Sequence, residues 1–334
     1  MSLTYLGLLL SLSIILLSCE LFTNGIELLG KELGLGDGVV GSILSAVGTC
    51  LPETLIPIIA ILFSKDGADT TDIGVGAILG APFMLSTLAF FVTGLSAIVF
   101  WEKRKTGMKM LVNPTILARD IKFFILVYSI SILSAFIDSS LIKLCIALGL
   151  IALYLFYVLL TVSNDSNSND QVEALILGKY LNVETNIGWI IFEVTLALGG
   201  IIFGAEIFIE NIQVVSANFG IPAFILSLII TPIATELPEK FNSIIWVSKK
   251  KDTLALGNIT GAMVFQSCIP VAIGIAATPW KLDFVGTVSA IISIFSALLL
   301  YSCLRRENKL TPIPLLMGGV FYVLFIIILV ISLN

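Results

Sequence analysis

Gly48-Thr49-Cys50-Leu51-Pro52-Glu53 and Ala234-Thr235-Glu236-Leu237-Pro238-Glu239 are the two stretches that decide the interpretation of this chain, because they repeat one pattern inside two long apolar runs. When residues 19–60 are placed over residues 205–246, no gap is needed and every position shifts by 186. Unrelated apolar segments match often at Ile and Leu but hardly at Thr-x-Leu-Pro-Glu. The chain therefore contains an internal repeat.

The composition places the chain in a membrane. Hydrophobic residues make up 57% of the 334 residues, charged residues only 12%, and the mean hydropathy is +1.07. A membrane-spanning helix needs about 20 mostly apolar residues, and such runs recur along the whole chain. Reading these runs between polar breaks predicts ten spans, at residues 4–30, 38–63, 73–101, 121–137, 140–162, 186–215, 222–247, 254–278, 283–303 and 311–333.

A polar stretch beginning at Ser163 (SNDSNSND) divides these spans into five and five. The predicted organisation is a first repeat at 1–162, a cytoplasmic linker at 163–185 and a second repeat at 186–334. Because an odd number of spans separates equivalent helices, the halves must be inverted. The expected fold is thus an all-α membrane protein of ten transmembrane helices in two inverted five-helix repeats. Lys and Arg placement predicts both termini outside, and the expected location is a prokaryotic plasma membrane.

The two prolines predict a cation site at the repeat interface. Pro52 and Pro238 each remove a backbone donor and displace the carbonyl four residues earlier, which belongs to Gly48 or Ala234. Freed carbonyls, threonine hydroxyls and a neighbouring carboxylate are hard oxygen ligands, which suit Na+ and Ca2+. The alternative is that each proline only kinks its helix.

A glutamate follows each proline, at Glu53 and Glu239. A charged side chain at the bilayer centre costs about 2.5–3.5 kcal/mol on insertion scales, so a duplicated acid indicates a function. Inversion brings the two carboxylates toward each other near the midplane, where they fit one divalent or two monovalent cations.

These motifs resemble the two alpha-repeats of the cation/Ca2+ exchanger superfamily, which includes the Na+/Ca2+ exchangers and carries GTSLPE-like motifs. The resemblance covers residues 19 to about 94 and 205 to about 274. It implies ten helices, alternating access, and antiport of Ca2+ against Na+ or H+. It also implies that Glu53 and Glu239 are the central ligands, with oxygen atoms from Thr49 and Thr235.

The chain departs from the family pattern at several ligand positions. Cys50 and Glu236 stand where members usually have Ser, and the stretch 76–85 has lost the polar ligands of the third span. The eighth span keeps Asn258 and offers Gln266. A site rich in acids and poor in neutral oxygens leaves H+ open as an alternative to Na+, and the preferred divalent ion open among Ca2+, Mg2+ and Mn2+.

Three further charged residues are candidates for a counter-ion or gating role. Lys240, beside Glu239, either snorkels to water or acts as an internal counter-ion, in which case Lys240→Leu should raise cation affinity. Glu20 and Glu206 fall on equivalent positions of spans one and six. They are candidates for gating or proton access, with polar packing as the alternative.

Other classes of protein fit less well. Gly34-Leu35-Gly36-Asp37 spells the GxGD string of membrane aspartyl proteases, but no aspartate precedes Asp37, and the absence of histidine excludes several hydrolase classes. A passive channel would use rings of ligands around a pore. The net charge of −5 argues against nucleic acid. The expected partners are lipid and inorganic cations, with no resident cofactor and one chain sufficient for transport.

Overall fold

The computed structural model describes residues 2–32, 50–63, 68–104, 109–164, 174–181, 185–307 and 310–333. Within these ranges the regular structure is helical, apart from an isolated bridge between Met110 and Leu310. Seven helical stretches of the described residues, one of them the continuous run Thr70–Val99, are long and apolar enough to cross a membrane, and two shorter apolar helices accompany them. The chain is therefore an all-α integral membrane protein.

The helices of the first half of the chain follow the predicted spans closely. They are α1 (Ser2–Glu32), α4 (Leu51–Leu62), α5 (Ala68–Met84), the π-helix η2 (Leu85–Ala89), α6 (Phe90–Val99), α7 (Trp101–Arg104), α8 (Pro114–Leu133), the 3-10 helix η3 (Ser134–Phe136) and α9 (Ser140–Asn164). Residues 38–49 of the second predicted span lie outside the described residues. α8 begins seven residues before its predicted span, because the Asn113 side chain caps it and Pro114 occupies its first turn.

The second half begins with a short helix in the predicted linker, α10 (Ile176–Leu181), whose backbone N–H groups at Ile176 and Leu177 donate to Asn24 and Glu193. The remaining helices are α11 (Ile187–Phe219), α12 (Ala223–Thr235), α13 (Leu237–Ser248), α14 (Asp252–Ala277), α15 (Phe284–Glu307) and α16 (Pro312–Leu333). The predicted single span at 222–247 is two helices that meet at Glu236.

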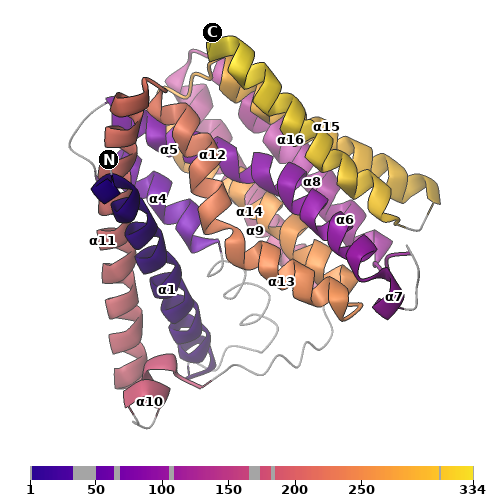
Figure 1. Ribbon diagram of the computed structural model, residues 1–334, viewed down its shortest axis with the longest axis horizontal. Helices are drawn as coiled ribbons and strands as arrows, with labels where there is room; N and C mark the ends of the chain where they lie inside the picture. Colours follow the sequence, from indigo (N-terminus) through magenta and orange to yellow (C-terminus); the bar gives the residue numbers. More distant parts are fainter. Residues whose placement is uncertain are drawn as a thin grey trace.

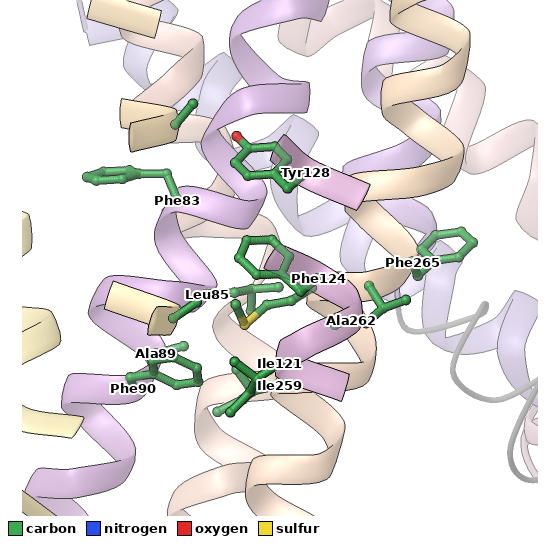
Figure 2. Packing of buried hydrophobic residues seen from close by; sticks show 14 of the residues in the cluster. Phe83, Leu85, Ala89, Phe90, Ile121, Phe124, Tyr128, Ile259, Ala262 and Phe265 are labelled. Atoms are coloured by element: carbon green, nitrogen blue, oxygen red, sulfur yellow. The ribbon is translucent and has the colours of Figure 1, made fainter. Parts of the chain in front are cut away.

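A central core forms around α5 and α14. The most apolar window of the helix run from α5 to α6 is 83% buried and that of α14 is 78% buried, whereas the window of α9 is only 17% buried. Figure 2 shows Phe124 and Ile121 of α8 lying among Leu85 of η2 and Ile259 of α14. The α5 and α14 helices are therefore enclosed by protein, and α9 presents most of its surface outward.

Helices α1 and α11 form a separate pair that runs side by side at one edge of the molecule (Figure 1). Their facing residues make a second apolar cluster, to which Leu51, Ile56 and Ile73 contribute from α4 and α5. Gly204 of α11 has no side chain where the Ile14 and Ile15 side chains of α1 approach. This pair thus contacts the rest of the protein chiefly through α4 and its neighbours.

A buried ion pair holds the α13–α14 turn against the loop before α8. Arg104 and Asp252 are both fully buried, and the guanidinium donates to both carboxylate oxygens, at 2.7 and 2.5 Å. Arg104 also donates to the Val247 carbonyl, and the Leu111 N–H donates to Asp252. The two terminal nitrogens of Arg104 and both carboxylate oxygens of Asp252 have hydrogen-bond partners, so we interpret the cluster as a structural ion pair.

Candidate cation-binding site

Two helix starts carry the repeated motif, and their geometry is nearly the same. Cys50 precedes α4 with φ −90° and ψ 8°, and Glu236 precedes α13 with φ −86° and ψ 8°. Each helix has 12 residues, with its proline in the first turn. Proline is tolerated there because the first N–H groups of a helix have no intrahelical partner. At Glu236 one helix therefore ends and another begins, whereas the sequence predicted a single kinked span.

Glu53 lies in the first turn of α4 and is only 3% exposed. Neither of its carboxylate oxygens has a hydrogen-bond partner among the described residues. The Thr235 hydroxyl lies beside it, but this hydroxyl donates to the Thr231 carbonyl at 2.9 Å. A buried carboxyl without a partner is costly, and the N-terminal end of α4 supplies only a partial positive charge.

Glu236 and Lys240 form a buried ion pair next to Glu53. Lys240 Nζ lies 3.3 Å from Glu236 Oε2, and both side chains are at least nine-tenths buried. The ammonium also donates to the Pro232 carbonyl at 3.4 Å. It interacts electrostatically with both Glu53 and Glu236, and these two acids interact with each other. The lysine therefore does not snorkel to water.

The other sequence-predicted residues lie at varied places. Thr235 is buried at the end of α12. Gln266 is buried on α14, and its Oε1 has no hydrogen-bond partner in the described part of the chain. Asn258 is half-buried, about two turns before Gln266 on the same helix. Cys50 is buried in the central core, close to Tyr154 of α9. The structure thus brings Glu53, Thr235 and Glu236 together, and it packs Cys50 toward α9.

Several predicted positions lie elsewhere. Glu20 and Glu206 are exposed on α1 and α11. Gly48 and Thr49 lie outside the described residues, as does the GxGD string at 34–37. For Ala234, Pro238 and Glu239 the helices are described but not the side chains. Within the described part of the chain no three His, Cys, Asp or Glu side chains cluster as metal ligands.

The buried acid Asp120 was missed by the sequence analysis. Asp120 of α8 is 2% exposed and accepts hydrogen bonds from Tyr157 of α9 at 3.0 Å and Thr260 of α14 at 3.1 Å. Arg119 also pairs with this carboxylate and lies over the Tyr157 ring. Its partners are far apart in sequence, so no spacing pattern could have found the cluster. Since the carboxylate is satisfied, it differs from Glu53.

Comparison with known proteins identifies the family. The profile of the sodium/calcium exchanger protein family matches residues 3–163 and 189–334. The chain belongs to this family. It is 24% identical to the protein named "Putative antiporter CaxA" of Alkalimonas amylolytica, over 95% of this chain and 97% of the relative. It is also 24% identical to the inner membrane protein YrbG of Escherichia coli K12, over 90% and 89%.

Solved structures of exchangers share the fold. A crystal structure of the H+/Ca2+ exchanger CAX matches with a TM-score of 0.73 and 18% identity, covering 98% of this chain and 82% of that one. The sodium-calcium exchanger NCX_Mj, soaked with Na+ and Sr2+, matches with a TM-score of 0.59 and 20% identity, covering 97% and 98%. Membership of the sodium/calcium exchanger family makes this chain a membrane transporter of the cation/Ca2+ antiporter class, and the solved exchangers share its fold.

Proposed function

We propose that this protein is a secondary active antiporter that exchanges Ca2+ for Na+ by alternating access. The observation that carries the proposal is the Glu53 carboxyl, which is buried at a helix start, has no hydrogen-bond partner among the described residues and lies beside the Glu236–Lys240 pair. A mobile cation would supply the charge and the contacts that the described residues do not. Ca2+ is named in the solved structures of CAX and, with Na+, in those of NCX_Mj.

The proposed ligands follow from the two motifs. Glu53 and Glu239 would be the central acids, with Thr49, Thr235 and Glu236 beside them. Carbonyl oxygens of Gly48 and Ala234, four residues before Pro52 and Pro238, would complete a hard oxygen cage. Cys50, Asn258 and Gln266 would be further ligands of the cation.

The proposed architecture has ten spans in two inverted repeats. Helices α4 and α13 begin 186 positions apart and have equal lengths, which supports the repeat. The α1–α11 pair would move against the central core between the two access states, with the exposed Glu20 and Glu206 on its surface as gating candidates. Both termini would lie outside.

H+ is the second candidate for the coupling ion, and one observation favours it. The part of α5 and η2 that packs in the core offers mainly apolar side chains such as Ala81, Phe83 and Leu85. The hydroxyls of Ser86 and Thr87 donate to the Phe83 carbonyl of their own helix. A Na+ site needs several oxygen ligands, whereas a proton needs only a carboxylate.

Uptake of 45Ca2+ into proteoliposomes tests the proposal. An outward Na+ gradient and an outward H+ gradient are applied separately to the wild type, to Glu53→Gln and to the exposed control Glu102→Gln. We expect one gradient to drive uptake, a loss of about 100-fold in Glu53→Gln, and little change in the control, since a neutral amide cannot balance a divalent charge. If neither gradient drives Ca2+ uptake by a folded wild type, the proposal is overturned.

A further inference from the structure

Lys240 occupies the position that Thr54 occupies in the other repeat, and Glu236 occupies that of Cys50. In α4 the Thr54 hydroxyl donates to the Cys50 carbonyl at 2.7 Å. In α13 the same pair of positions holds an ammonium 3.3 Å from a carboxylate. The second repeat therefore carries an acid and a base where the first carries a thiol and a hydroxyl, and the added net charge is zero.

The surroundings of the Lys240 ammonium resemble those of a bound cation. Among the described residues, its oxygen contacts come from the Glu236 side chain and from the Pro232 carbonyl of α12. The Pro232 carbonyl also accepts the N–H of Glu236, so it lies at the break between α12 and α13. With the side chain only 6% exposed, water does not neutralise the charge, and the carboxylates of Glu236 and Glu53 must do so.

We propose that Lys240 is a resident cation of the transport site, and that it lowers by one the number of monovalent cations moved in each cycle. The ammonium neutralises Glu236, so this third acid needs no mobile ion. Because the side chain is attached to α13, its charge never leaves the protein. Removing it would leave one more negative charge to be balanced by a cation from solution. This inference rests on the proposed function and adds the stoichiometry.

The test is the equilibrium accumulation of 45Ca2+ in proteoliposomes clamped at zero membrane potential, under a tenfold gradient of the coupling ion that the wild type uses. Each coupled ion multiplies the accumulation ratio by its own gradient. One additional ion should therefore raise the ratio about tenfold in Lys240→Met. The ratio at equilibrium does not depend on transport rate, so a slow variant is still informative.

Three variants serve as controls. Lys240→Arg keeps the charge, and the double variant Glu236→Gln with Lys240→Met removes both members of the pair. Lys143→Met removes another buried lysine, whose ammonium donates to the Pro279 and Trp280 carbonyls. All three should keep the wild-type ratio. An unchanged ratio in Lys240→Met would overturn the inference, because a purely structural ion pair does not alter stoichiometry.

Equilibrium binding of 22Na+ to purified protein in detergent separates this inference from the proposed function. If the folded wild type takes up no Ca2+, the proposed function fails, and binding still decides the role of Lys240. At saturation Lys240→Met should bind about one more Na+ per chain than the wild type, and the double variant should not. Equal binding by Lys240→Met and the wild type would overturn the resident-cation inference.

Discussion

The start of α4 and the break between α12 and α13 have the same backbone but different charges. The residues before the two helices differ by 4° in φ and not at all in ψ, although one is Cys50 and the other Glu236. What the stretches share is Leu-Pro-Glu, with the proline in the first turn of a helix. The backbone geometry therefore follows from the proline and its position, whereas the charge depends on residues that are free to vary around it.

The difference in charge lies at the helix start and one turn later. The first repeat closes its turn with a neutral hydrogen bond from Thr54, and the second closes it with the Lys240 ion pair. Both Thr54 and Lys240 are 6% exposed, so the two arrangements are equally secluded from water. A buried ion pair is a weak contributor to stability as a whole, but either member alone is a strong liability.

Glu236→Gln should give the largest loss of stability among the variants that break this comparison. The substitution leaves the Lys240 ammonium buried without its carboxylate, which costs about 3–5 kcal/mol for pairs of this kind. The free energy of unfolding in detergent, measured by denaturant titration, provides the test. The double variant with Lys240→Met should recover most of the loss. If Glu236→Gln alone is as stable as the wild type, the two charges are not dependent on each other.

Much of this comparison could be predicted from the sequence, because the repeat is gapless. The constant offset predicted equivalent helices, and α4 and α13 do have equal lengths. The predicted family is confirmed, and so is the all-helical membrane class. The inverted orientation, the count of ten spans and the roles of the site residues stay predictions.

Other features could not be predicted because they depend on packing between distant segments. Proline signals both a kink and a helix start, and the sequence does not distinguish them, so the two helices at Glu236 were read as one span. Asp120 directly precedes the predicted span at 121–137, and only folding brings Tyr157 and Thr260 to it. Likewise, a lysine in an apolar run reads as snorkelling until the Pro232 carbonyl is seen beside it.

Gly80→Ala should cause the next largest loss of stability. The reason is that α12, the helix before the break at Glu236, packs directly against α5. A Cβ at Gly80 would lie 2.2 Å from the Leu228 carbonyl oxygen, and one at Gly76 would lie 2.4 Å from the Phe224 oxygen. Both obstacles are backbone, so the helices must separate, and we expect a loss of about 1–3 kcal/mol.

Gly149→Ala is the matched control, since this glycine is exposed on α9 and no described atom lies within 4 Å of its added Cβ. This variant should be neutral or slightly more stable, because alanine favours a helix interior by about 0.5–1 kcal/mol. Thermal unfolding of both variants in detergent provides the measurement. Equal midpoints for Gly80→Ala and the wild type would show that the break does not need close contact with α5.

Thr54→Val should have the smallest effect, and it tests whether the neutral turn of the first repeat matters in the same way as the charged one. The variant keeps the shape of the side chain and removes the hydroxyl that donates to the Cys50 carbonyl. A typical neutral hydrogen bond contributes about 1 kcal/mol, so the unfolding midpoint should fall by a few degrees while the 45Ca2+ accumulation ratio stays at the wild-type value. Lys240→Met should instead change that ratio, because it removes a charge. If Thr54→Val altered the accumulation ratio as well, the geometry of the first turn of α4 would influence the number of coupled ions. Charge alone would then not explain the difference between the repeats.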